Sequence, residues 1–127
     1  MIQNLKNGVA ARGYDVVSFF NGSPRKGKEK FVTEFNGAKY HFSSSENRNK
    51  FEIAPENYAP QYGGFCAIAM SEDKKMNPNP KSWEIRDGKL YFFTQMLFGI
   101  IDAKRQWVKD PETKRILADS AWKKMNR

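Results

Sequence analysis

The chain has 127 residues, of which 39% are hydrophobic and 14% aromatic, which is enough apolar material for one packed domain over residues 1–127. Its net charge is +8, with the positive excess in residues 1–39 and 99–127. No run of about 18 apolar residues occurs, so no transmembrane helix is predicted. The single cysteine, Cys66, excludes an intrachain disulfide and a cysteine-rich zinc site.

The basic balance and the N-terminus leave partner and compartment open. Basic ends attract nucleic acid or anionic lipid, but they also occur as ordinary solvated surface, which we favour. Basic residues are interleaved with acidic ones, so there is no strong nucleic-acid signal. The sequence MIQNLKNGVA lacks the basic and apolar segments of a secretory signal. The sequence therefore leaves the compartment unknown: we expect periplasmic or secreted if a signal peptide was removed, and cytoplasmic otherwise.

Two segments open the chain. Residues 16–20 form a short apolar segment ended by Asn21-Gly22. Residues 30–42 predict a β-hairpin that turns at Asn36-Gly37, a pair suited to a type I′ turn. The expected pairs are Phe35 with Ala38, Thr33 with Tyr40, and Phe31 with Phe42 on the buried face, and Glu34 with Lys39 and Val32 with His41 on the other face.

The middle of the chain predicts a short helix and then a strand. Ser43 and Glu46 have the spacing of a capping box, and Pro55 stops the helix at Ala54. After Gly63-Gly64, residues 65–70 read FCAIAM and alternate as a strand buried on both faces. Cys66, Ile68 and Met70 share one face of that strand.

The last third predicts a second hairpin and two helices. Residues 83–93 turn at Asp87-Gly88. Helical spacing then relates Leu97, Ile100, Ile101, Lys104, Trp107 and Val108. Asp110-Pro111 predicts the start of a further helix with Ile116, Leu117, Ala121 and Trp122 facing inward. The fold class is therefore α+β: two antiparallel hairpins and a central strand, packed with a short helix and two C-terminal helices.

The run FSSSENRNKFEIAPENYAPQYGGFCAIAM, preceded by GYDVVSFF and followed by WEIRDGKLYFF, resembles the YHS-domain family from about Gly13 to Trp122. It is most similar to the stand-alone bacterial proteins of that family, many of them secreted or lipid-anchored. Related short modules in copper-transporting ATPases and some monooxygenases are presumed to bind metal. The resemblance therefore implies metal binding, with copper first.

One departure from the family pattern bears on that implication. The two cysteines of the related modules fall at Ser43 and Asn47 in this chain. Neither residue supplies a thiolate, the donor on which soft-metal sites rely. The sequence instead favours helix capping and a polar surface at these two positions.

The remaining metal candidates are Cys66, His41 and Met70, with Met76 as a further thioether. Each also fits a structural role: Cys66 as a buried hydrophobe, His41 as a strand residue on a polar face, and the methionines as core. We expect a non-catalytic soft-metal domain that uses these residues, or a homodimer that doubles the ligand count. The alternative is a metal-free domain for a small molecule or a protein partner, with Cys66 in the core.

An enzyme is the less favoured reading. Cys66 and His41, oriented by Asp15, supply the residue types of a nucleophile, base and orienting group, but no motif places them together. Asp15 also fits the capping or orienting of a turn. Tyr58, Tyr62 and Phe65 could line a small-molecule pocket, although core packing is the simpler role.

Overall fold

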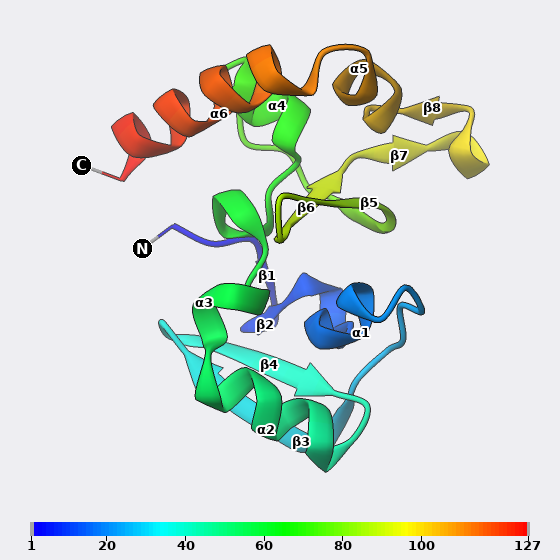
Figure 1. Ribbon diagram of the computed structural model, residues 1–127, viewed down its shortest axis with the longest axis vertical. Helices are drawn as coiled ribbons and strands as arrows, with labels where there is room; N and C mark the ends of the chain where they lie inside the picture. The colour runs from blue at the N-terminus through cyan, green and yellow to red at the C-terminus, as the bar shows by residue number, and fades with distance from the viewer. Residues whose placement is uncertain (1, 127) are drawn as a thin grey trace.

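The computed structural model describes residues 2–126 and is elongated, with two halves stacked along its long axis (Figure 1). The first half contains β1 (Leu5–Lys6), β2 (Val9–Ala10), η1 (Ala11–Gly13), α1 (Val16–Phe20), β3 (Lys28–Phe35), β4 (Ala38–Phe42), α2 (Ser45–Ile53) and α3 (Pro55–Tyr58). The second half contains η2 (Gln61–Gly64), α4 (Ala67–Ser71), β5 (Asn79–Arg86), β6 (Lys89–Phe93), β7 (Gln95–Met96), η3 (Leu97–Gly99), β8 (Ile101–Asp102), α5 (Lys104–Lys109) and α6 (Pro111–Met125). The predicted α+β class is confirmed.

The first half is a four-stranded sheet in the order β1-β2-β4-β3, covered on one face by α2. The predicted hairpin, its turn at Asn36-Gly37 and the pairs Glu34–Lys39 and Val32–His41 are confirmed. The predicted pairing of Phe31 with Phe42 is wrong. Lys28 pairs with Phe42, because an irregularity between Lys28 and Val32 shifts the register.

Residues 65–70 do not form the predicted strand. Ala67–Ser71 is the helix α4, which packs against α6, and Cys66 makes only an isolated bridge to Phe92. A short apolar run that is buried on every side does not distinguish helix from strand by its periodicity. The sheet therefore lacks its predicted central strand.

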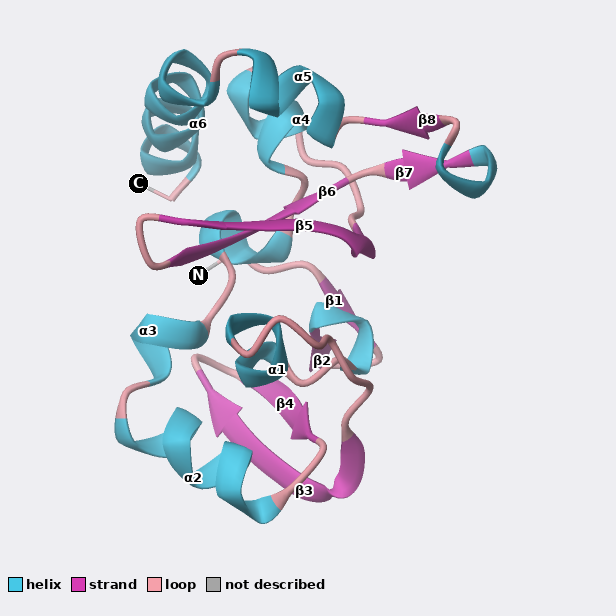
Figure 2. Ribbon diagram, turned by 45° about the vertical axis from the view of Figure 1, so that its right-hand side comes forward, coloured by secondary structure: helices cyan, strands magenta, loops and turns pink. Residues whose placement is uncertain are grey.

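The β5–β6 hairpin is the part of the second half that borders the first half (Figure 2). Its predicted turn is confirmed, and the pairing puts Trp83 opposite Phe92 and Ile85 opposite Leu90. Alternate residues of β6 enter different cores, because successive strand side chains point to opposite faces. Leu90 and Phe92 belong to the core of the first half, whereas Tyr91 and Phe93 belong to the core of the second half.

The C-terminal third differs most from prediction. Residues 97–103 do not form the predicted α-helix; Leu97–Gly99 is the short 3-10 turn η3 at the end of the small β7–β8 hairpin, and Leu97, Ile100 and Ile101 are exposed. The predicted start of α6 is confirmed, because the Asp110 side chain accepts a hydrogen bond from Thr113 N.

The inward face predicted for α6 is also partly wrong. Ile116 and Leu117 are exposed, and the helix packs inward through Ala118 and Ala121. The small alanine side chains allow α4 and α6 to approach closely. The orientation of α6 is therefore set by close contact between the two helices and not by burial of its largest side chains.

No helix in residues 2–126 has the length and apolar character needed to span a bilayer.

Candidate functional site

The two positions at which the related modules carry cysteine converge on Asp15. Asp15 is fully buried and caps α1: its Oδ1 accepts from Val17 N at 2.9 Å and Ser18 N at 3.3 Å. Its Oδ2 accepts from Ser43 N at 2.9 Å, Ser43 Oγ at 2.7 Å and Asn47 Nδ2 at 2.8 Å. This group, which we call the Asp15 cluster, joins the N-termini of α1 and α2.

The Asp15 cluster explains why Ser43 does not cap α2. Ser44 caps it instead, because its side chain accepts from Asn47 N at 3.1 Å, so the predicted capping box at Ser43 is wrong. The capping role anticipated for Asp15 is confirmed. Five donors occupy the carboxylate, and no thiolate lies among them, so the cluster does not fit a soft metal ion. The signal for it in the sequence was Asp15 directly before the apolar segment 16–20.

Cys66 and Met70 lie in the core of the second half. Cys66 is 1% exposed, and its N–H donates to Met76 O at 3.1 Å. Met70 is fully buried. Cys66 lines a cavity of about 410 Å³ together with Met76 and Met96, and Met70 is not among the residues that line it. We call this space the Cys66 cavity.

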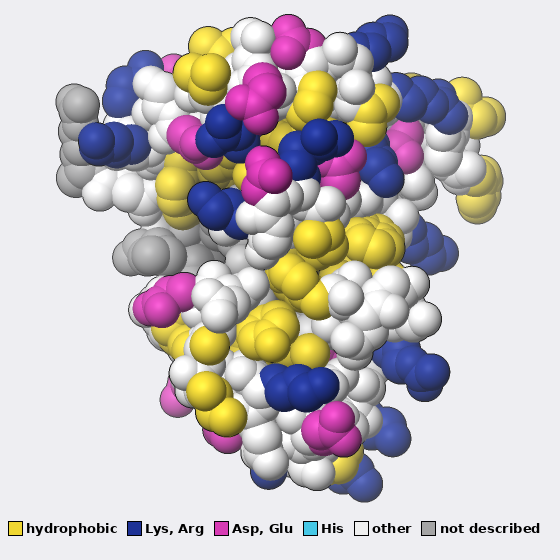
Figure 3. Space-filling view, viewed as in Figure 1, with side chains coloured by type: hydrophobic (Ala, Val, Ile, Leu, Met, Phe, Trp, Pro, Cys, Tyr) yellow, Lys and Arg dark blue, Asp and Glu magenta, His cyan; other side chains and the backbone are white. Residues whose placement is uncertain are grey.

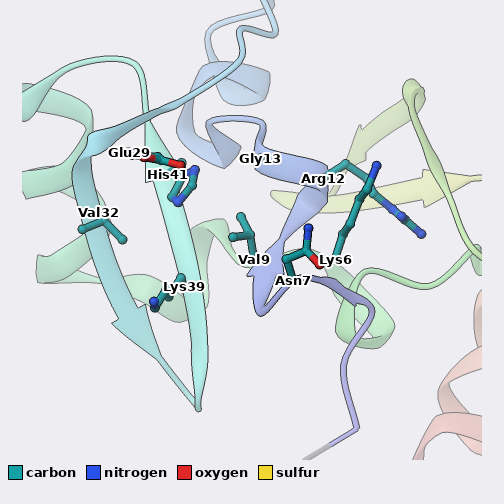
Figure 4. Close-up of a pocket in the computed structure, with 9 residues that line it drawn as sticks. All are labelled: Lys6, Asn7, Val9, Arg12, Gly13, Glu29, Val32, Lys39 and His41. Atoms are coloured by element: carbon teal, nitrogen blue, oxygen red, sulfur yellow. The ribbon is translucent and has the colours of Figure 1, made fainter.

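His41 lines a different cavity in the first half (Figure 4). The structure therefore does not bring His41 into one pocket with Cys66 or Met70. Within residues 2–126 no three His, Cys, Asp or Glu side chains are grouped so that they could hold a metal ion. As one ligand set, Cys66, His41 and Met70 do not fit a copper ion, because their donors are distributed over the two halves.

The cavity beside His41, which we call the basic cavity, measures about 550 Å³. The hairpin β3–β4 contributes Lys39, His41, Glu29 and Val32 to its lining, and the neighbouring β1, β2 and η1 contribute Lys6, Asn7, Val9, Arg12 and Gly13 (Figure 4). The two groups adjoin because β2 pairs with β4 in the same sheet, in parallel, at Val9 and Lys39. Segments that are about 30 residues apart in the chain thus meet around one hollow.

The cations of the basic cavity lack partners in the part of the chain that the structure describes. Lys6, Arg12 and Lys39 form neither an ion pair nor a side-chain hydrogen bond within residues 2–126. The Nε of Arg12 is buried without a hydrogen-bond partner, and Arg12 has a positive φ of 54°. The sequence analysis did not identify Lys6, Arg12 and Lys39. The one signal in the sequence was the alternation that puts Lys39 on the same strand face as His41.

Tyr62 lies mainly in the core of the second half and not in a small-molecule pocket. It is buried, its hydroxyl donates to Asp119 Oδ1 at 2.7 Å, and Phe65 packs against the same core. Burial raises the pKa of Tyr62 strongly, and the hydrogen bond to the Asp119 carboxylate raises it further. The tyrosine therefore joins η2 to α6 and is held in its neutral form.

The comparison with protein families matches residues 16–62 to the YHS domain. The match covers α1, the β3–β4 hairpin, α2 and α3, and it includes the Asp15 partners Ser43 and Asn47. It ends before Cys66, so the Cys66 cavity lies outside the matched region. Searches of curated proteins and of solved structures gave no match. Residues 16–62 therefore match a YHS domain, and the rest of the chain lies outside the match.

Proposed function

We propose that this protein is a non-catalytic binding domain that holds a small anionic molecule in the basic cavity without a resident metal. The observation that supports this proposal is the set of Lys6, Arg12 and Lys39, three cations that line one hollow with no ion pair among the described residues. Like charges gathered around a hollow attract a ligand of opposite charge.

The lining of the cavity indicates the class of ligand. A volume of about 550 Å³ lies in the usual range for small-molecule sites. The guanidinium of Arg12 suits a carboxylate or phosphate group, which it can bind through two parallel hydrogen bonds. Val9 and Val32 add apolar surface, and Glu29 repels a second negative group on its side of the hollow. These features favour a small organic carboxylate or phosphate over an extended polyanion.

The arrangement does not favour covalent catalysis. Cys66 lines another cavity than His41, and the Asp15 carboxylate is occupied by backbone and side-chain donors of the Asp15 cluster. A nucleophile needs its base within hydrogen-bond reach. The candidate set from the sequence, Cys66, His41 and Asp15, therefore does not form an assembled nucleophile, base and orienting group.

Isothermal titration with inorganic phosphate, citrate and AMP tests the proposal, with glycerol as a neutral probe. At least one anion should bind, and Arg12→Gln combined with Lys39→Gln should weaken it about tenfold or more, since charged hydrogen bonds contribute about 1.5–3 kcal/mol each. The matched control is Lys30→Gln with Lys50→Gln, two exposed lysines outside the cavity. Equal affinities for the cavity variant and the control would contradict the proposal.

A soft-metal site is the second candidate, and one observation favours it. The Cys66 cavity brings a thiol and two thioethers, Met76 and Met96, to one space. Sulfur donors of these types select Cu(I). This set keeps Cys66 from the sequence prediction but replaces His41 and Met70 with two exposed methionines.

Anaerobic Cu(I) titration against a competing chelator tests this second candidate. Cys66→Ala, and separately Met76→Leu with Met96→Leu, should each weaken Cu(I) binding, whereas His41→Ala should leave it unchanged. Equal, weak binding by the wild type and Cys66→Ala would remove the candidate. Because the two candidates use different cavities, the anion titration and the metal titration give independent answers.

A further inference from the structure

The β7–β8 hairpin ends in a cluster of large apolar side chains that face solvent. Phe98 is fully exposed, Ile100 is 71% exposed and Leu97 is 61% exposed, and Met96 and Ile101 are also exposed. We call these five residues the apolar tip. The hairpin projects from the second half in Figure 1, and Figure 3 shows hydrophobic side chains at the same end of the molecule. Exposed apolar groups gathered in this way mark an interaction site.

Hydrogen bonds fix the base of the hairpin. Asp102 accepts from Ser82 Oγ at 2.5 Å, Gln95 Nε2 at 3.1 Å and Lys104 N at 3.1 Å. At the turn, the guanidinium of Arg105 donates to Ile100 O at 2.6 Å and Gly99 O at 2.9 Å. The apolar tip is therefore held in place before any partner arrives, which lowers the entropic cost of binding.

The backbone of the turn disfavours the side chains that it carries. Leu97 and Phe98 have φ values of 53° and 54°. These values lie in the left-handed region, which glycine and asparagine adopt readily and bulky residues adopt rarely. A turn of this shape built only for stability would place asparagine or glycine here. Folding alone does not explain Leu97 and Phe98, because they gain no burial in return.

Two cations lie close to the apolar tip. Arg105 donates hydrogen bonds to the turn and lines the Cys66 cavity beside Ile100 and Ile101. Lys75 lines a hollow together with Met96. Glu72 also lines the Cys66 cavity, and the carboxylate of Asp102 is engaged by the three internal donors. An apolar tip with cations beside it matches an interfacial layer with an acyl region behind anionic headgroups.

We propose that the apolar tip inserts Leu97 and Phe98 into the interfacial layer of a bilayer that contains anionic lipid, while Arg105 and Lys75 contact the headgroups. The tip is convex, and a fluid bilayer accommodates a convex point without a matching pocket. A second copy is the weaker occupant. The five side chains by themselves bury less than the roughly 800 Å² per partner that a stable dimer needs.

Flotation with lipid vesicles tests the proposal. The wild type should float with phosphatidylcholine vesicles that contain about 30% phosphatidylglycerol, and binding should fall as NaCl rises from about 0.05 M to about 0.5 M. Leu97→Asn with Phe98→Asn should reduce binding at least about tenfold while the protein stays folded, because asparagine tolerates the left-handed conformation. The matched control is Ile53→Asn with Ile116→Asn, two residues 84% and 60% exposed on other helices, which should bind as the wild type does.

A second readout locates the contact. In a Cys66→Ala background, Phe98→Cys labelled with an environment-sensitive fluorophore should shift to the blue on anionic vesicles, whereas Ile53→Cys should not. Absence of wild-type binding, or equal binding by the tip variant, would overturn the proposal. So would a dimer seen by analytical ultracentrifugation that the tip variant abolishes, without any vesicle binding. These outcomes do not depend on the basic cavity.

Discussion

The hydroxyl of Ser43 donates a 2.7 Å hydrogen bond to Oδ2 of Asp15, 28 positions earlier in the chain. This contact ties the start of α2 to the start of α1, at a position where related modules carry cysteine. A serine hydroxyl and the Asn47 amide serve as donors there, while a thiolate would be an additional negative charge beside Asp15. The YHS motif in this chain therefore acts as a structural joint.

The first prediction concerns the stability contributed by this joint. Asp15→Ala should lower the free energy of unfolding by about 3 kcal/mol or more, because it removes a cap and leaves buried donors unsatisfied. Asp110→Ala, which removes the exposed cap of α6 with one hydrogen bond, should cost only about 1 kcal/mol. Urea unfolding measures both. Equal losses would show that the partners of Asp15 contribute little.

Introducing cysteines at positions 43 and 47 should create a metal site beside Asp15. In Ser43→Cys with Asn47→Cys, both thiols would lie beside Asp15 Oδ2, since both native side chains reach that oxygen. We expect Zn²⁺ or Cu(I) affinity at least about tenfold above the wild type, by chelator competition. The control is Ser45→Cys with Asn49→Cys, which has the same spacing on the exposed face of α2. An equal gain in the control would mean that spacing alone, and not Asp15, creates the site.

Gly27 should not tolerate a side chain. A Cβ at this position would collide with the backbone carbonyl of His41, at the irregular part of the β3–β4 pairing. Gly27→Ala should therefore destabilise the protein by about 1–3 kcal/mol. Gly37→Asn is the control: it has a φ of +80° and open space around it, which asparagine accepts, so its cost should stay below about 1 kcal/mol. Thermal unfolding distinguishes the two, and a neutral Gly27→Ala would refute the close approach.

The base of the β7–β8 hairpin should weaken at acidic pH. Partial burial acts to raise the pKa of Asp102, but hydrogen bonds from Ser82, Gln95 and Lys104 N outweigh it, and the net pKa lies below the usual 3.8. A depressed carboxyl pKa stabilises the folded state above its unfolded-state pKa and loses that contribution as the pH falls through the folded-state value. The stability difference between the wild type and Asp102→Asn should thus shrink from pH 6 to about pH 2.

Urea unfolding across this pH range measures that difference, with Glu56→Gln as the control. Glu56 is exposed and has no ion pair or side-chain hydrogen bond in residues 2–126. A difference for Asp102→Asn that does not change with pH would contradict the assignment.

The two halves should unfold together. We propose that residues 1–127 form one domain, because β6 sends Phe92 into one core and Phe93 into the other. Phe92→Ala and Phe93→Ala should each cost about 3–5 kcal/mol and should leave a single unfolding transition. Calorimetry, with circular dichroism and tryptophan fluorescence as separate probes, checks this. Two separated transitions in either variant would show independent halves.

Elements defined by local chemistry could be predicted from the sequence. The turns at Asn36-Gly37 and Asp87-Gly88 fix the register of both hairpins close to each turn. Asp110-Pro111 marks the start of α6 in the same way. Prediction failed at residues 65–70, because a run that is apolar on both faces suits a strand or a helix equally well. It also failed at residues 97–103, where apolar residues at helical spacing lie in a hairpin.

The candidate sites were less predictable than the fold. The sequence drew attention to Cys66 and His41 as the sole residues of their types, but rarity does not bring two side chains together. The basic cavity joins Arg12 and Lys39 across a parallel pairing that no local pattern announces. The apolar tip was missed because helical spacing placed Leu97 and Ile100 inside a helix.

The sequence by itself determined the α+β class, the two hairpin turns, the absence of a cysteine pair from the motif, and the start of the last helix. Each of these depends on neighbouring residues or on composition. Tertiary structure alone decided that Ser43 and Asn47 bind Asp15, that β6 divides its side chains between two cores, and that the apolar tip faces solvent. These features depend on burial and on contacts between distant segments, and burial is a property of the whole packed chain.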